Sequence, residues 1–172
     1  MISISEIKAK CSNPAEVRTR LQEQGAIHKG TDVQTDTYFI VKDGRLKLRE
    51  GMIENALIFY ERENTATAKH SRVILHKTGH TDRTLKEVLL ASHDVKVVVK
   101  KQREIYFINN VKFHIDEVEG LGSFVEIEAI DTTGTMNYSF LQKQCTDFME
   151  LLGITEADLL THSYSDILLS EA

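Results

Sequence analysis

Charged side chains occupy every second position in several segments of the sequence, and within each segment nearly all have the same sign. The clearest runs are the cations Arg45, Lys47 and Arg49, the cations Lys101 and Arg103, and the acids Glu126 and Glu128. Residues two apart share one face of a strand, where like charges repel unless an opposite charge lies between them. A polyanion among the cations and a divalent cation among the carboxylates would each provide that opposite charge.

This combination is the chemistry of a triphosphate. Arginine offers forked donors and lysine a compact charge for phosphate oxygens. Mg²⁺ or Mn²⁺ binds to a few carboxylates together with the phosphates themselves. Phosphoryl transfer depends mainly on positioning and charge neutralisation. The alternative is an ordinary sheet with one solvated face, which predicts no specific anion affinity.

The charged runs lie in segments whose alternation predicts strands. We expect strands over residues 2–11, 34–41, 45–50, 56–63, 72–77, 95–108, 111–119 and 123–130. Helices are expected from a cap at Ser12 or Asn13 to Gly25, over 81–91 and over 137–152, with shorter pieces at 155–160 and 165–169. About eight strands, several of them joined by hairpins, predict an antiparallel sheet that closes into a barrel or splits into a sandwich.

Length and composition predict a soluble cytoplasmic protein with a single domain over 1–172. No apolar run reaches the roughly 20 residues of a membrane span, and the N-terminus lacks the pattern of a signal peptide. Residues 1–115 carry 20 Lys and Arg against 14 Asp and Glu, whereas 116–172 carry one Lys and 12 acids. The pI of about 5.8 argues against a nucleic-acid partner.

Several segments together make the chain resemble the CYTH family, the triphosphate tunnel metalloenzymes. The matching segments are SEIKAK at 5–10, QTDTYF at 34–39, RLKLR at 45–49, IFYER at 58–62, VKKQRE at 99–104, DEVEGLGSFVEIE at 116–128 and SYSDIL at 163–168. The resemblance implies an α+β fold, a closed eight-stranded antiparallel β-barrel with flanking helices whose charged interior forms a triphosphate tunnel.

The resemblance also implies roles for individual residues. Phosphate binding is expected from Lys8, Lys10, Lys47, Arg49, Arg62, Lys101 and Arg103, with Arg45, Lys69 and Arg72 as weaker candidates. Metal binding is expected from Glu6, Glu126, Glu128 and Asp116, the last as a metal ligand or as a group that orients a cation. Lys8, Arg103 and Asp116 are the expected catalytic residues. Tyr60 and His114 are candidates to face the tunnel.

One position departs from the family pattern. The opening motif of the family is Glu-x-Glu-x-Lys, and here it is Ile4-x-Glu6-x-Lys8. In several members both acids take part in metal binding. With Ile4 in place of the first acid, this chain lacks one of the metal ligands of those members, so the resemblance does not imply a complete metal site or full activity.

The resemblance implies a metal-dependent enzyme, either a class IV adenylyl cyclase-like protein or a triphosphatase, with Mg²⁺ or Mn²⁺ as cofactor. The substrate is expected to be a small triphosphate such as ATP, thiamine triphosphate or tripolyphosphate, with no nucleic acid and no membrane as partner. The protein is expected to be a monomer or a homodimer. The alternative, motivated by Ile4, is a non-catalytic nucleotide or polyphosphate sensor with a degraded metal site.

Overall fold

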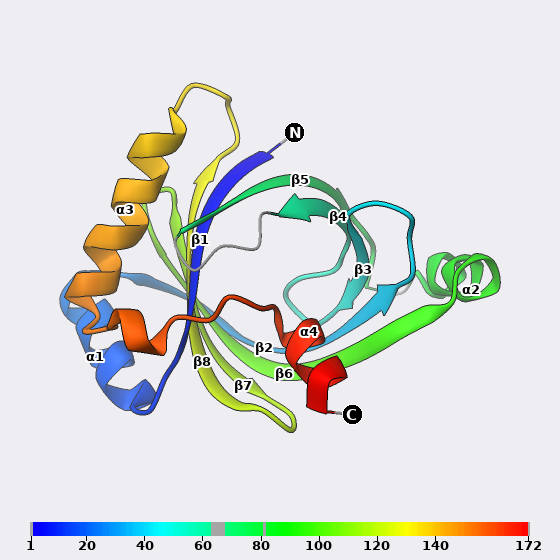
Figure 1. The fold of residues 1–172 in the computed structure, drawn as a ribbon, viewed down its shortest axis with the longest axis horizontal. Helices are drawn as coiled ribbons and strands as arrows, with labels where there is room; N and C mark the ends of the chain where they lie inside the picture. The colour runs from blue at the N-terminus through cyan, green and yellow to red at the C-terminus, as the bar shows by residue number, and fades with distance from the viewer. Residues whose placement is uncertain (1, 63–67, 81, 172) are drawn as a thin grey trace.

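The fold, a computed structural model describing residues 2–62, 68–80 and 82–171, is built on one closed antiparallel barrel (Figure 1). The strands are β1 (Ile2–Lys10), β2 (Ile27–Phe39), β3 (Arg45–Glu50), β4 (Ala56–Arg62), β5 (Lys69–Lys77), β6 (Val95–Ile108), β7 (Val111–Val118) and β8 (Gly122–Asp131). Around the barrel their order is β1-β5-β4-β3-β2-β6-β7-β8, and β8 pairs with β1 to close it. The predicted α+β barrel is confirmed, and the sandwich is excluded.

The helices of the described chain are α1 (Pro14–Glu23), α2 (Arg83–Ser92), α3 (Tyr138–Leu151) and α4 (Tyr164–Glu171), with a 3₁₀ turn, η1 (Glu156–Asp158). The side chain of Asn13 caps α1 by accepting from the backbone N–H of Glu16, and Asn137 caps α3 in the same way. Gly25 follows α1 at a φ of 71°, a value that glycine adopts without steric cost. These caps confirm the predicted limits of both helices.

The outer face of the barrel is covered on one side by α1 and α3, which lie next to each other in Figure 1. Strands β1, β7 and β8 turn alternate apolar residues outward to these helices. Together they form a buried cluster that includes Ile7, Leu21, Phe113, Ile127, Leu141 and Cys145. Because this core lies outside the barrel, the other face of the same strands is free to carry charge.

Two strands begin several residues earlier than the sequence predicts. β2 begins at Ile27 rather than Gln34, because it pairs with the 14-residue β6 from Ile27↔Phe107 onward. The irregularity between His28 and Gly30, where Gly30 has a φ of 140°, hides the alternation in the sequence. β5 likewise begins at Lys69. The predicted helix at 155–160 is only the single turn η1, while Glu63 and Thr81, predicted element ends, lie outside the described residues.

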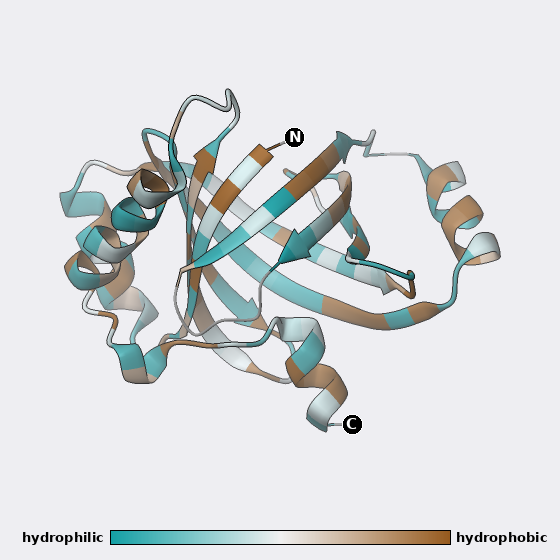
Figure 2. Ribbon diagram, turned by 45° about the horizontal axis from the view of Figure 1, so that its top comes forward, coloured by the Kyte–Doolittle hydropathy of each residue, from teal (hydrophilic) through white to brown (hydrophobic). Residues whose placement is uncertain are grey.

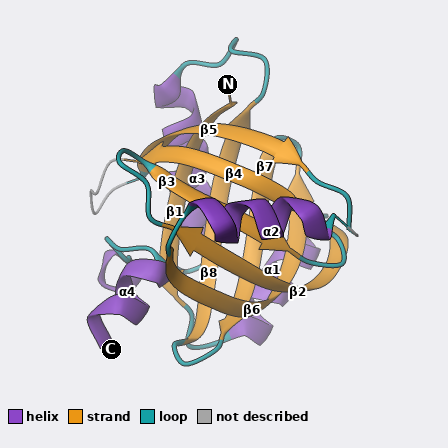
Figure 3. Ribbon diagram, turned by 90° about the vertical axis from the view of Figure 1, so that its right-hand side faces the viewer, coloured by secondary structure: helices purple, strands orange, loops and turns teal. Residues whose placement is uncertain are grey.

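α2 lies in front of the strands in the view of Figure 3. Its one buried side chain, Leu89, packs with Phe39 and Leu48 in a small cluster beside the barrel. Lys86 of this helix pairs with Glu50 at 2.8 Å. Among the described residues, no helix combines the length and the apolarity that a membrane span requires.

Candidate active site

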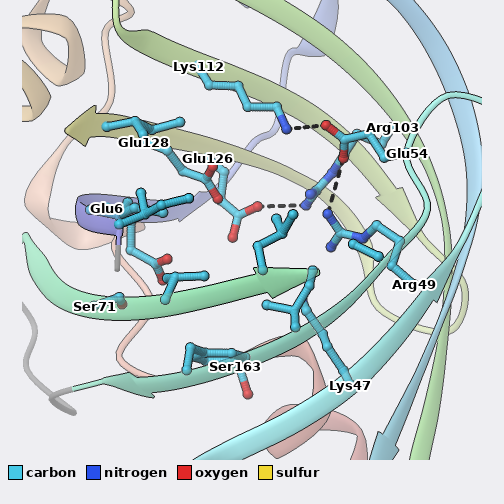
Figure 4. Close-up of a pocket in the computed structure, with 18 of the residues that line it drawn as sticks. Glu6, Lys47, Arg49, Glu54, Ser71, Arg103, Lys112, Glu126, Glu128 and Ser163 are labelled. Carbon is cyan, nitrogen blue, oxygen red and sulfur yellow. Dashed lines mark hydrogen bonds and ion pairs between the residues drawn. The ribbon is translucent and has the colours of Figure 1, made fainter. Parts of the chain in front are cut away.

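A cavity of about 480 Å³ is enclosed by residues from all eight strands of the barrel (Figure 4). Nine cations line it: Lys8, Lys29, Lys47, Arg49, Arg62, Lys77, Lys101, Arg103 and Lys112. Four acids line it as well: Glu6, Glu54, Glu126 and Glu128. The interior is therefore charged, with cations in excess.

One group of cations surrounds Asp36, a fully buried residue of β2. Its carboxylate accepts hydrogen bonds from three side chains, Lys47 at 3.1 Å, Arg49 at 2.8 Å through two nitrogens, and Lys101 at 2.8 Å. Burial alone would raise the pKa of Asp36, but the charges of Arg49, Lys101 and Lys47 hold that pKa well below its ordinary value. One carboxylate therefore fixes three cations and leaves the group positive.

A second group is centred on Arg103 of β6. Its guanidinium donates to both carboxylate oxygens of Asp116, at 2.7 and 2.6 Å, and to Glu126 at 2.6 Å. The hydroxyl of Tyr164, in α4, donates to Asp116 at 2.8 Å. Lys8 pairs with the other oxygen of Glu126 at 2.8 Å. Arg103 is thus held rigidly by two acids, and the C-terminal helix contributes to that support.

Arg62 has donors left over. Its Nη1 donates to Glu6 at 2.5 Å, but Nε and Nη2 are buried and have no hydrogen-bond partner among the described residues. Arg62 lines the cavity, and its side chain is only 3% exposed. A buried polar group without a partner is costly, and the cost is larger when the group is charged. An anion in the cavity would satisfy these nitrogens.

A third group brings together His114, Glu126 and Glu128, each of which offers one ligand atom within 4.8 Å of the others. The Nδ1 atom of His114 lies 3.1 Å from Glu126 and 4.0 Å from Glu128. Burial, together with Arg103 and Lys112, lowers the pKa of His114 to about 3, so the imidazole is neutral. Two carboxylates and a neutral imidazole fit a divalent cation.

Glu128 makes a pH-dependent contribution to stability. Burial and the neighbouring Glu126 raise its pKa to about 7. Because this pKa lies above the ordinary value, the contribution is present at low pH and is lost as the pH rises through 7. We expect wild type to lose this contribution as the pH rises, whereas Glu128→Gln cannot titrate. With EDTA present, the free energy of unfolding of Glu128→Gln minus that of wild type should therefore increase by on the order of 2 kcal/mol from about pH 5 to pH 8.

Urea unfolding across this pH range measures the difference. Glu119→Gln is the matched control, because Glu119 is exposed. Parallel pH profiles for wild type and Glu128→Gln would show that Glu128 titrates normally in the folded protein.

The structure brings most of the predicted site residues together. Lys8, Lys47, Arg49, Arg62, Lys101 and Arg103 line one cavity with Glu6, Glu126 and Glu128. Asp116 is not among the residues that line it, because this side chain lies against Arg103 and Tyr164; the structure therefore favours its cation-orienting role. Lys10 is exposed at the end of β1 and is not among the residues that line the cavity.

The weaker candidates also differ in whether they line the cavity. Tyr60 lines the cavity. Arg45 pairs with Asp166 of α4 at 2.9 Å, and Lys69 donates to backbone carbonyl groups of the segment before α4. Arg72 is exposed. Arg45 and Lys69 therefore hold the C-terminal segment against the barrel.

No site role was assigned from the sequence to Asp36, Glu54 and Lys112, nor to Lys29 and Lys77, which also line the cavity. Glu54 lies in the loop before β4 and contacts Lys112 and Arg49 (Figure 4). The signal for Asp36 was its alternation with Gln34 and Tyr38, all of which are buried. Lys112 alternates with His114 and Asp116 in β7, so its inward direction was also readable. Glu54 has no such signal, because it lies outside any strand.

Solved structures share this fold along nearly the whole chain. The PH1012 protein from Pyrococcus horikoshii OT3 has a TM-score of 0.80 at 24% identity, covering 95% of this chain and 98% of that one. A Vibrio parahaemolyticus protein proposed to be an adenylate cyclase has a TM-score of 0.77 at 18% identity, covering 96% and 97%. HpAC1 from Hippeastrum, described with a dominant triphosphatase activity, has a TM-score of 0.66 at 13% identity, covering 99% and 96%.

No curated protein sequence matches the chain. The CYTH domain, in contrast, matches residues 5–164 and so spans the barrel from β1 to the start of α4. This match includes all the residues found to line the charged cavity except Ile2 and Ile4. The chain belongs to the CYTH domain family.

Proposed function

We propose that this protein is a divalent-metal-dependent enzyme that hydrolyses a triphosphate bound inside the barrel. The observation that carries the proposal is the cavity with nine lining cations, in which two buried nitrogens of Arg62 have no partner among the described residues. A cavity of this charge favours a polyanion, and a small one, because the strands enclose it.

The phosphate oxygens would contact Lys8, Lys47, Arg49, Arg62, Lys101 and Arg103. Asp36 and Asp116 hold four of these cations in place before any substrate binds. Donors fixed in advance stabilise developing charge without reorganising during the reaction. Lys8 and Arg103 both contact Glu126, and this position beside a candidate metal ligand supports their catalytic role.

Glu126, Glu128 and His114 would hold the metal, and Glu6 is the cross-strand neighbour of Glu128. These residues would hold Mg²⁺ or Mn²⁺, which would supply Lewis-acid chemistry at a phosphoryl oxygen. In this assignment Asp116 positions Arg103, so the predicted metal role of Asp116 is replaced by that of His114.

Adenylyl cyclase activity is the second candidate. It is supported by the fold shared with the Vibrio protein that is proposed to be an adenylate cyclase. HpAC1, with the same fold and a dominant triphosphatase activity, supports hydrolysis. The two reactions use the same cation-lined cavity and differ in which phosphorus atom lies beside the metal.

The test incubates the protein with tripolyphosphate, ATP and thiamine triphosphate, each with Mg²⁺ or Mn²⁺, and separates the products by chromatography. We expect orthophosphate from at least one substrate and no product in EDTA. Cyclic AMP with pyrophosphate would establish the cyclase instead. Binding without any product would establish a sensor, which is the outcome that Ile4 in place of the family's first Glu would explain.

A further inference from the structure

The cavity has a continuous apolar wall. Four neighbouring strands, β8, β1, β5 and β4, form it with the lining residues Ile130, Ile2, Ile4, Val73, Leu75 and Ile58. Cross-strand pairing places these side chains next to one another, since Ile4 pairs with Ile130, Ile2 with Val73 and Ile58 with Leu75. The wall is therefore a single patch and not a scatter of apolar residues.

The patch lies at one end of the barrel. It occupies the beginnings of β1 and β4 and the ends of β5 and β8, and Figure 2 shows hydrophobic residues in the first part of β1. Further along the same inward faces the residues become charged, as with Glu6 and Lys8 in β1 and Arg62 in β4. Ile4, which stands in the place of the family's first Glu, belongs to this apolar patch.

The opposite wall of the same cavity is cationic. Strands β3, β2, β6 and β7 complete the barrel, and from them Lys47, Arg49, Lys101, Arg103 and Lys112 line the cavity. Lys8, Arg62 and Lys77 also line the cavity from β1, β4 and β5, so the hydrocarbon is confined to the patch itself. A ligand beside the patch therefore meets branched hydrocarbon there and the cations of β3, β2, β6 and β7 across the barrel. The cavity volume of about 480 Å³ lies in the range of small-molecule sites.

We infer that the organic group on the bound polyphosphate is aliphatic, an alkyl or isoprenoid chain that lies against this apolar wall while its phosphates face the cations. The inference rests on the proposed function, whose substrate class it narrows. Burial of such a chain removes both ligand and wall from water. A purine needs hydrogen-bonding partners for its ring nitrogens, and branched aliphatic side chains offer none.

The test compares two diphosphate esters with the same charged group, geranyl diphosphate and methyl diphosphate, by isothermal titration calorimetry in Mg²⁺. Each buried methylene is worth about fourfold in affinity. We expect geranyl diphosphate to bind about tenfold or more tightly than methyl diphosphate, since part of the chain lies against the wall.

The variant that tests the wall is the double substitution Ile4→Thr with Ile58→Thr, which keeps β-branched residues in both strands. We expect it to lower the ratio of the two affinities below that of wild type, while the four remaining apolar residues of the wall keep the ratio above one. Ile74→Thr is the matched control, because Ile74 is 54% exposed on β5 and is not among the residues that line the cavity. In this control the ratio should stay as in wild type. The ratio is independent of any effect on the phosphate site.

Equal affinity for both esters, with tripolyphosphate still bound, would overturn the aliphatic assignment and leave the proposed function intact. The aliphatic assignment would also be overturned if the affinity increased more from tripolyphosphate to ATP than from methyl diphosphate to geranyl diphosphate. That result would show that the site prefers a nucleobase. If none of these anions binds, the proposed function fails as well.

Discussion

Asp36→Asn is expected to lower the free energy of unfolding by about 3–5 kcal/mol. Asp36 is the only carboxylate within hydrogen-bond distance of both Lys47 and Lys101 among the described residues, and it also holds Arg49. An asparagine of the same shape keeps one acceptor oxygen but removes the negative charge. Three buried or half-buried cations would then repel one another with little compensation.

Urea unfolding at neutral pH measures this loss. Asp94→Asn is the control, because Asp94 is exposed, and we expect a change within about 0.5 kcal/mol. A loss for Asp36→Asn as small as that of the control would show that the cations do not depend on this carboxylate.

The same variant also reports on the ligand. In Asp36→Asn the cations lack their internal counter-ion, so a bound polyanion should relieve more repulsion than in wild type. Because a ligand that binds the folded state stabilises it by an amount set by its affinity, tripolyphosphate should raise the unfolding midpoint of Asp36→Asn more than that of wild type. An equal rise in both proteins would place the anion away from Lys47, Arg49 and Lys101.

Glu126→Gln is expected to reduce metal-dependent turnover by about 10²–10³-fold, the size of loss seen when one preorganised group that stabilises the transition state is removed. Glu126 lies between Lys8 and Arg103 and contacts His114, so it belongs both to the cation groups and to the candidate metal site. Glutamine keeps the side-chain shape but is a weaker ligand for a hard cation.

Orthophosphate release at saturating Mn²⁺ measures turnover, and calorimetric titration of Mn²⁺ measures metal affinity, which should fall in parallel. Glu119→Gln is again the control, because Glu119 is exposed in the turn between β7 and β8. Circular dichroism checks that the variant retains its strands. A folded Glu126→Gln protein with full turnover would place the metal elsewhere.

The direction of most side chains was readable in the sequence because a barrel strand alternates strictly between its two faces. Arg45, Lys47 and Arg49 were predicted to share a face, and Lys47 and Arg49 do line the cavity. The same rule predicted that Lys101 shares a face with Arg103, and Glu126 with Glu128. The outward face was equally readable, since Ile7 and Ile127 pack under α3 and α1.

What the alternation could not supply is position along the barrel axis. Lys10 is in phase with Lys8, but it lies beyond the end of the cavity and is exposed. Arg45 is in phase with Lys47, but Asp166 of the distant α4 holds it. Such outcomes depend on register between strands and on contacts across long sequence separations, which no single segment encodes.

Partners across the barrel were also beyond the sequence. Glu54 comes from a loop and reaches Arg49 on β3 and Lys112 on β7. His114 was a candidate to face the tunnel only because it lies two residues from Asp116 on the same strand. Its contact with Glu126 depends on the β7–β8 pairing, in which these two residues are opposite. Closure of the barrel creates these contacts.

Titration of tripolyphosphate into the protein by calorimetry tests the central claim most directly. Arg62→Gln removes the guanidinium whose Nε and Nη2 have no partner among the described residues, and Arg72→Gln removes an exposed arginine on the neighbouring strand. We predict binding by wild type and Arg72→Gln, and binding weaker by about tenfold or more in Arg62→Gln. Equal affinity in all three proteins, or no binding to wild type, would contradict a polyphosphate site inside the barrel.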